Sequence, residues 1–305
     1  MGPLKNRRSE FRDLLEYLSA RVLYAGFTAL PPTAAAVFAR NVAASLLRWS
    51  LIERRRLGRE NLALALASSY TEQEREKILR GVFEHIALTA TEFFLFPPRP
   101  DRRECPIAVS GESERNLAGL RKRGGGVIFV TGHLGNWEVL GATAGASFGF
   151  PIQSIARRLD NRHLDRWVER RRKAFGQTVV TKEGSVGELI RTIRRGGNVA
   201  YLVDQDAHRE GVFVDFFGIP ASSTRAPALL SIRTGAPIVP VCAVRERPFC
   251  FTLHLSETIY PRTNTPISEE IPRITQQYTS ALENWIRRYP DQWLWLHRRW
   301  KTRPT

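Results

Sequence analysis

The sequence predicts an α/β protein with a central mixed β-sheet flanked by helices, preceded by an N-terminal helical segment that associates with a membrane. From residue 106 onward, short apolar runs rich in β-branched residues alternate with helix-forming stretches. Residues 22–39 instead carry no charge, and arginines border them on both sides. The 305 residues are enough to bury a sizeable core, as one large domain or two smaller ones.

The uncharged stretch over residues 22–39 is close to the length of a membrane span, which takes about 20 residues. Pro31 and Pro32 interrupt it, and proline removes helix hydrogen bonds and clashes with the preceding turn. We expect two helices that form an apolar hairpin dipping into a membrane face, with basic residues at the headgroups. The alternative is that these helices pack on the domain. A cleavable signal peptide is not expected, because the charged lead is long.

We assign the hairpin to residues 1–57 and the α/β domain to residues 58–305. Residues 61–92 are predicted to be helical, with Thr71 and Glu74 as a capping box. The predicted strands are 126–131, 152–157, 177–181, 199–203, 238–244 and 250–256. The predicted helices that alternate with them are 113–123, 137–148, 160–175, 185–195, 224–234 and 270–289.

The formal net charge is +16 and the sequence pI is near 10.6, which indicates an anionic partner. Nucleic acid, an anionic membrane, an acidic carrier protein and a phosphorylated substrate all qualify, and a solvated basic surface is the alternative. No nucleic-acid-binding module is recognisable, so a nucleic-acid-binding protein is supported by charge alone. The three cysteines are widely spaced without a CxxC pair, which predicts neither a zinc site nor a disulfide framework and fits a reducing compartment.

His133 and Glu138 form the candidate catalytic pair, because they stand where a predicted strand passes into a helix. Five positions are a poor match to one helix face, so His133 is expected on the loop and Glu138 in the first helical turn. Gly135 permits a tight turn, and Asn136 is a suitable N-cap. The positive helix N-terminus favours an ionised Glu138 and a neutral His133, the forms that a base and its orienting carboxylate need. The exposed amides around Gly135 and Asn136 are candidates for binding an oxyanion.

The string Gly132-His-Leu-Gly-Asn-Trp-Glu138 resembles the active-site motif of the bacterial lipid A biosynthesis acyltransferases, the late lauroyl/myristoyl family. That family is more distantly related to glycerolipid acyltransferases with an H-x4-D motif. Other segments resemble family segments in the same order, over about residues 20–303: Asn61-Leu62, residues 156–161, Arg172 with Gly176, residues 204–206, 216–221, 234–240 and 289–301. The chain departs from the family at residues 222–225, where a Thr-x-Gly type of turn is more usual, and its N-terminal segment is weak for a spanning anchor.

The resemblance implies an enzyme that transfers a fatty acyl chain from an acyl carrier protein thioester to a hydroxyl of a lipid A precursor, at the cytoplasmic face of the inner membrane. His133 would be the general base, and Glu138 would orient it. A thioester is a good acyl donor, so no metal and no cofactor is expected. Coenzyme A as the donor carrier, or another acceptor such as a phosphatidylinositol mannoside, is the alternative.

The resemblance also assigns substrate-binding positions: Arg157, Asn161, Arg172, Asp204 and Gln205. An arginine fork suits a phosphate or carboxylate headgroup, and structural ion pairs are the alternative. Asp204 would share a sheet edge with His133 if their strands are parallel, and would orient Arg157, Arg172 or the acceptor, or be structural.

The tryptophans and basic residues of segment 293–301 predict either a membrane-interface cluster or a packed aromatic core.

Overall fold

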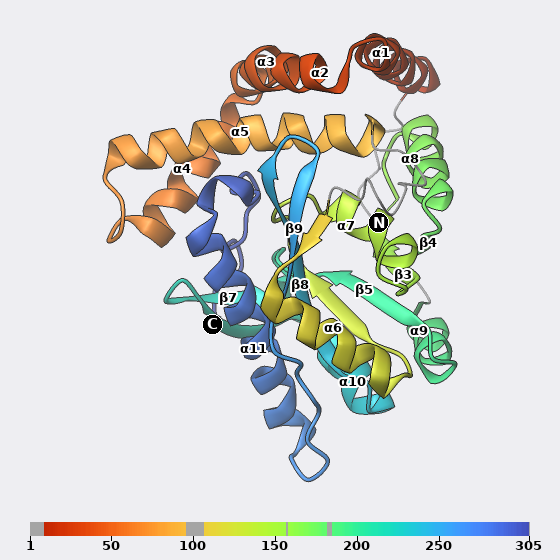
Figure 1. Ribbon diagram of the computed structural model, residues 1–305. Coiled ribbons are helices and arrows are strands. Elements are labelled where there is room, and N and C mark those ends of the chain that lie inside the picture. Colours follow the sequence, from red (N-terminus) through yellow and green to blue (C-terminus); the bar gives the residue numbers. More distant parts are fainter. Residues whose placement is uncertain (1–8, 96–106, 157, 182–184, 305) are drawn as a thin grey trace.

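A seven-stranded sheet forms the centre of the protein, whose computed structural model describes residues 9–95, 107–156, 158–181 and 185–304 (Figure 1). Neighbouring strands are parallel except for the antiparallel pair β8 and β9, so the expected central mixed sheet is confirmed. The strand order is β1 (Ile107–Val109), β9 (Cys250–Leu255), β8 (Ile238–Arg247), β2 (Ile128–Thr131), β5 (Asn198–Leu202), β3 (Ile152–Ala156) and β4 (Thr178–Thr181).

Helices cover both faces of the sheet, and alternation along the central strands creates two separate cores. In β2, Ile128 and Val130 pack in one apolar cluster with helices α5, α10 and α11, whereas Phe129 packs in the other with α6 and α7. The helices of this part are α6 (Gly111–Arg123), α7 (Trp137–Ala146), α8 (Arg162–Ala174), α9 (Ser185–Arg194), α10 (Ala226–Thr234) and α11 (Ile267–Arg288).

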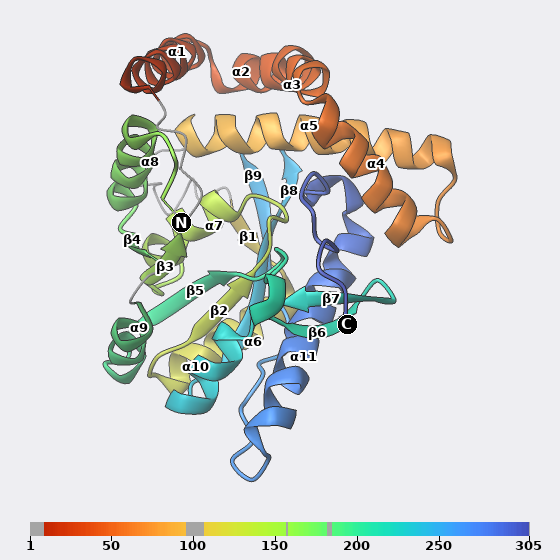
Figure 2. The same cartoon turned by 180° about the vertical axis from the view of Figure 1, so that it is seen from behind.

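Residues 10–50 form a layer on the outer side of α5, away from the sheet (Figures 1 and 2). The predicted break at Pro31 and Pro32 is confirmed, because α1 ends before it and Pro32 begins the next helix, where its missing N–H costs nothing. The elements are α1 (Glu10–Thr28), α2 (Pro32–Phe38), the π-helical turn η1 (Ala39–Ala43), α3 (Ala44–Ser50), α4 (Ile52–Leu66) and α5 (Glu72–Leu95). Within the described ranges, no helix is both long and apolar enough to cross a bilayer.

The helix expected over residues 61–92 is in fact two helices, α4 and α5. The capping box is confirmed, since the Thr71 N–H donates to Glu74 Oε2 at 2.7 Å and the Glu74 N–H donates to Thr71 Oγ1 at 3.4 Å. A capping box satisfies the free N–H groups of a helix start, so it marks where a new helix begins. The boundary proposed between residues 57 and 58 falls inside α4.

Three strands were not predicted: β1, and the hairpin β6 (Val212–Phe216) and β7 (Ile219–Ser223). The hairpin turns at Phe217 and Gly218, both with positive φ. Glycine adopts that conformation readily but phenylalanine rarely does, so the pair lacks the Asn-Gly or Asp-Gly sequence typical of such a turn.

Candidate active site

His133 and Asp204 meet because their strands run in parallel next to each other. Strands β2 and β5 pair in register, with Thr131 opposite Leu202, and the Val203 N–H donates to Thr131 O at 2.9 Å. The loops that follow the two strands therefore leave the same edge of the sheet, where sites of such sheets collect. The expected shared edge of His133 and Asp204 is confirmed.

The buried Asp204 carboxylate holds the His133 ring. Asp204 Oδ1 lies 2.8 Å from His133 Nδ1, and Oδ2 accepts the His133 backbone N–H at 2.6 Å and the indole N–H of Trp293 at 2.9 Å. An ionised carboxylate only accepts hydrogen bonds, so Nδ1 carries a proton. In the neutral imidazole the lone pair is then on Nε2, the nitrogen that can take a proton from a substrate.

The environment of His133 shifts its pKa upward. Burial by itself lowers the pKa of His133, but the charge and hydrogen bond of Asp204, together with the charge of Glu138, raise it above the ordinary value of 6.5. Burial likewise opposes ionisation of Asp204, yet His133 and His297 hold the pKa of that carboxyl far below its ordinary value. Asp204 is therefore the permanently charged partner of the imidazole.

Glu138 binds Arg172 rather than the His133 ring, so the hydrogen bond that orients the imidazole in this structure does not come from Glu138. Its oxygens accept two hydrogen bonds from Arg172, from Nε at 3.0 Å and Nη2 at 2.5 Å. Such a bidentate pair fixes both side chains, and Glu138 raises the pKa of Arg172 against the effect of burial. The carboxylate that orients the imidazole is Asp204, for which the family resemblance implies substrate binding.

The backbone amides of Gly135 and Asn136 are occupied, which corrects their expected role in binding an oxyanion. The Gly135 N–H donates to Gln292 O at 3.0 Å, and the Asn136 N–H donates to Ala243 O at 2.9 Å. Asn136 is the predicted N-cap, because its Oδ1 accepts from the Val139 N–H at 3.0 Å.

A buried polar cluster, not predicted from the sequence, contacts this turn through Gly135 and Asn136. Arg245 donates to both oxygens of Glu92, at 2.8 and 2.6 Å, and Glu92 accepts from Asn136 Nδ2 at 2.8 Å. Burial and the charge of Arg245 lower the pKa of His85 strongly, so His85 is neutral, with Nδ1 accepting from Arg245 and Nε2–H donating to Gly135 O at 3.1 Å. The sequence feature that could have indicated this cluster is Glu92, a single acidic residue in the apolar C-terminal part of the helix predicted over residues 61–92.

The other predicted binding residues lie in different settings. Asn161 is buried as the N-cap of α8, where Oδ1 accepts two backbone N–H groups and Nδ2 donates to Asp13 O at 2.8 Å, so it is structural rather than substrate-binding. Gln205 is exposed after β5, and its binding role stays a prediction. Arg157 lies outside the described residues.

Segment 293–301 forms a packed aromatic core, one of the two alternatives that its sequence predicts, rather than a membrane-interface cluster. Trp293, Trp295 and Trp300 are all buried. Arg299 is buried as well, and donates to Ser222 O at 2.6 Å and to Ser223 Oγ. Asn61 ties α4 to this segment by donating to the backbone oxygens of Trp295 and His297.

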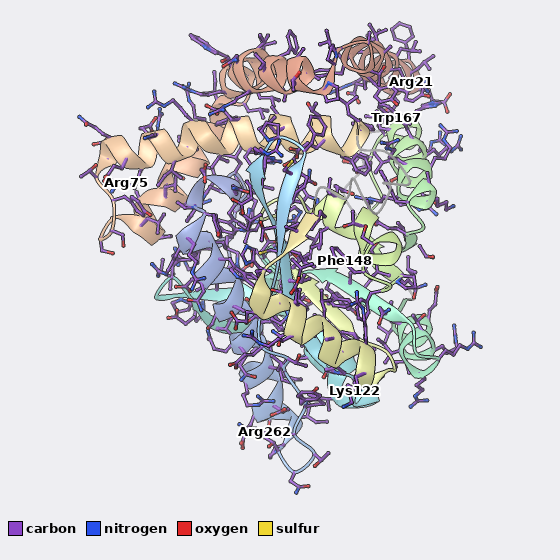
Figure 3. All side chains as sticks on the ribbon, viewed as in Figure 1. Arg21, Arg75, Lys122, Phe148, Trp167 and Arg262 are labelled. Atoms are coloured by element: carbon purple, nitrogen blue, oxygen red, sulfur yellow. The ribbon has the colours of Figure 1, made fainter. Side chains whose placement is uncertain are left out.

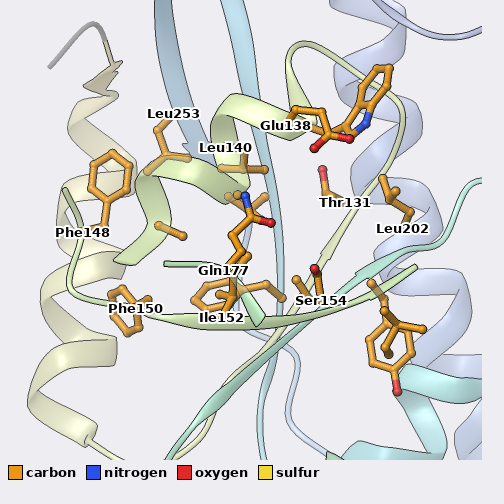
Figure 4. Close-up of a pocket in the computed structure, with 18 of the residues that line it drawn as sticks. Thr131, Glu138, Leu140, Phe148, Phe150, Ile152, Ser154, Gln177, Leu202 and Leu253 are labelled. Carbon is orange, nitrogen blue, oxygen red and sulfur yellow. The ribbon is translucent and has the colours of Figure 1, made fainter. Parts of the chain in front are cut away.

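An apolar cavity opens beside the His133 site, between α7 and the sheet (Figure 4). Its lining includes Thr131, Trp137, Glu138 and Arg172, and the Trp137 ring packs edge-on against the His133 ring with centroids 4.9 Å apart. The rest of the lining is largely aliphatic and aromatic, for example Leu117, Phe129, Phe148, Phe150, Ile152 and Leu253. The interior of the cavity is about 100 Å³, and the space between its lining side chains is about 840 Å³ when the part open to solvent is counted.

No group of three or more His, Cys, Asp or Glu side chains that could hold a metal ion occurs in the described part of the chain.

Gly135 is required by the geometry of the turn, which gives a first testable prediction. Its φ is +57°, and a Cβ there would lie 1.9 Å from Ala243 O. We expect Gly135→Ala to lower the free energy of unfolding by about 3 kcal/mol or more, because backbone must move. Urea unfolding measures this.

The matched control is Gly149→Ala, since Gly149 has a φ of +77° and open space around the missing Cβ. Gly149→Ala should lower the free energy of unfolding by only about 1–2 kcal/mol, the cost of placing alanine in the left-handed region of backbone conformation. Equal losses in the two variants would contradict the predicted clash.

Comparison with known proteins assigns the sequence to a family. The sequence profile described as "Bacterial lipid A biosynthesis acyltransferase" matches residues 5–302. The chain belongs to this family. The resemblance found in the sequence is thereby confirmed, and the protein is an enzyme that transfers acyl groups.

Relatives within this acyltransferase family act on different lipids, according to their names. The lipid A biosynthesis palmitoleoyltransferase of Escherichia coli is 27% identical over 267 residues, 85% of this chain and 83% of the relative. A phosphatidylinositol mannoside acyltransferase of Mycolicibacterium smegmatis is 29% identical over 183 residues, 58% of this chain and 57% of the relative. Among solved structures, a 1-acyl-sn-glycerophosphate acyltransferase from Thermotoga maritima aligns with a TM-score of 0.39 and 13% identity, over 83% of this chain and 98% of that chain.

Proposed function

We propose that this acyltransferase moves a fatty acyl chain from an acyl carrier protein thioester to a hydroxyl of a lipid A precursor, with His133 as the general base. The observation that carries the proposal is the His133–Asp204 pair beside an apolar cavity. The pair supplies a base for the hydroxyl, and the cavity supplies a dry site for an acyl chain. The proposed acyl transfer uses no metal and no cofactor.

The proposed transfer uses groups of the chain alone. His133 Nε2 takes the proton from the acceptor hydroxyl while its oxygen attacks the thioester carbon. The N–H groups of Trp137 and Glu138 lie in the first turn of α7, where a helix has no internal acceptor for them, and they would stabilise the oxyanion. As the carbon–sulfur bond breaks, the proton on Nε2 passes to the leaving thiolate. The products are the acylated lipid and the free thiol.

The charge of the protein supports an anionic acceptor and an acidic carrier protein. The net charge is +16, and Arg166 and Arg170 are exposed on α8, the helix that also carries Arg172 at the cavity. Exposed arginines suit the phosphates of a lipid A precursor. The mycobacterial relative favours a phosphatidylinositol mannoside as a second candidate acceptor.

The test is to incubate the purified protein with acyl carrier thioesters of several chain lengths and a lipid A precursor, and to weigh the products by mass spectrometry. We expect a mass increase of one acyl group. Acylation of a phosphatidylinositol mannoside alone would favour the second acceptor, and no increase with any donor and lipid would refute the proposal.

We further propose that the N-terminal helices lie in the cytoplasmic face of the inner membrane. These helices carry many large apolar side chains that are exposed, and a soluble protein rarely exposes many such side chains together unless they contact a partner or a membrane. They include Phe11, Leu15, Leu18, Val22, Leu23, Val37, Leu46 and Trp49. Helix α1 also packs on α8, where Arg21 lies 5.6 Å from the Trp167 ring (Figure 3), so this surface adjoins the basic helix of the site.

A double variant tests the membrane surface. Leu46 and Trp49 are three residues apart on α3, and their exposed fractions are 64% and 77%. Replacing both by serine should weaken binding to vesicles containing anionic lipid by at least about tenfold, because two apolar side chains no longer enter the bilayer. Vesicle co-sedimentation measures the partition.

Tyr260→Ser is the control for vesicle binding, because Tyr260 is 54% exposed. It lies two residues from Arg262, at the opposite end of the molecule from the N-terminal layer (Figure 3). Equal weakening in the control and the double variant would contradict the proposed surface.

A further inference from the structure

Gln177 places a polar group inside the apolar cavity. Gln177 directly precedes β4, and its backbone N–H donates to Arg172 O at 3.1 Å. The residue is 6% exposed and its side chain lines the cavity. Figure 4 shows it between Glu138 and Thr131 on one side and Phe148 and Phe150 on the other.

The opposite wall is shaped to leave room for this amide. A Cβ on Gly141 of α7 would lie 2.7 Å from Gln177 Nε2 and 3.0 Å from Oε1. Any larger residue at position 141 would therefore push the amide out of its place. The absence of a side chain on Gly141 keeps the amide of Gln177 inside the cavity.

The Nε2 group of Gln177 has no hydrogen-bond partner within the described residues. By contrast, Ser154, which also lines the cavity, donates to Thr178 O at 3.5 Å, and Glu138 and Arg172 pair with each other. A buried amide without a partner is costly. An unsubstituted hydrocarbon chain in the cavity has no group that could accept a hydrogen bond from Gln177 Nε2, so the free-energy cost of burying this amide would remain.

We propose that Gln177 binds a hydroxyl group carried by the acyl chain, so that the preferred donor is a hydroxyacyl thioester. A hydroxyl both accepts and donates, so it satisfies the side-chain amide in either orientation about its terminal bond. Sites built to pair with a hydroxyl discriminate strongly against the analogue that lacks it. This inference rests on the proposed function, in which the cavity holds the donor's acyl chain.

A competition experiment tests the proposal. Acyl carrier thioesters of one chain length are mixed in pairs, one unsubstituted and the other with a hydroxyl at the second, third or a mid-chain carbon. The product ratio by mass spectrometry gives the ratio of kcat/KM. For the preferred hydroxyl position, we expect the wild type to favour the hydroxyacyl donor by roughly ten- to a hundredfold, the effect of an unpaired buried polar group.

Variants assign the preference to the amide. Gln177→Leu keeps the approximate size without the polar group and should bring the ratio to one or below while retaining transfer of the unsubstituted chain. Gln177→Met is a second apolar variant in case the first does not fold. Ser154→Ala is the matched control, and should keep the wild-type ratio because its hydroxyl already has a partner.

The outcomes separate the two proposals. A wild-type ratio of one or below at every hydroxyl position overturns the role of Gln177 and leaves the acyltransferase proposal standing. A preference that survives in both Gln177 variants also overturns it. No transfer from any thioester refutes the proposed donor and, with it, this inference.

Discussion

Replacing His133 by alanine should reduce kcat by about 10²–10⁴-fold, the usual contribution of a general base. The ring would no longer offer Nε2 to the acceptor hydroxyl. The KM for the acyl donor should change little, because His133 is not among the side chains that line the cavity. Steady-state rates with a purified thioester and lipid measure both quantities.

The control for this change is His208→Ala. His208 is exposed and pairs with Asp206 at 3.5 Å rather than with the site. Its loss should leave kcat unchanged. If His133→Ala kept the wild-type rate, His133 would not be the base.

The dependence of the wild-type kcat/KM on pH should reflect the titration of His133. The base must be neutral to take a proton, so kcat/KM should fall as the pH drops through the pKa of His133. Because Asp204 and Glu138 raise that pKa, the acid limb should lie above pH 6.5. A limb below 6.5 would contradict this assignment.

The sequence predicted the strands of the sheet core and their alternation with helices, because buried parallel strands are short apolar runs with clear ends. It also placed His133 on a loop and Asn136 at a helix start, which depend on local rules alone. The break at Pro31 was likewise local. The hairpin at Phe217 was missed because its turn residue does not match the conformation that it adopts.

Pairing between distant side chains was not predictable in the same way. The motif spacing suggested that Glu138 serves His133, yet the order of strands brings Asp204 to the ring and α8 brings Arg172 to Glu138. The cluster around Glu92 joins residues more than a hundred positions apart. Such contacts follow from sheet order, which local sequence patterns do not contain.

Asp204→Asn should lower kcat about as much as His133→Ala does. Among the residues that the structure describes, Oδ2 accepts from two donors, the His133 N–H and the Trp293 indole, whereas Oδ1 contacts only the ring Nδ1. The oxygen of an asparagine will therefore stay with the two donors, and its NH₂ group will face Nδ1. An NH₂ group donates, so the imidazole must keep its proton on Nε2, where it cannot act as a base. In Ser-His-Asp enzymes the same change lowers kcat by about 10⁴-fold, and we expect a loss of that order.

The pH profile distinguishes this tautomer effect from a general loss of structure. Removing the charge of Asp204 lowers the pKa of His133, so the residual activity of Asp204→Asn should have its acid limb at lower pH than the wild type. Asp206→Asn is the matched control, because Asp206 lies in the same loop but bonds Thr302 rather than His133. It should keep both the rate and the limb. If Asp204→Asn stayed active with an unmoved limb while Glu138→Gln lost activity, Glu138 would be the carboxylate that serves His133 in the reaction, and the pairing in the structure would not be the one used in catalysis.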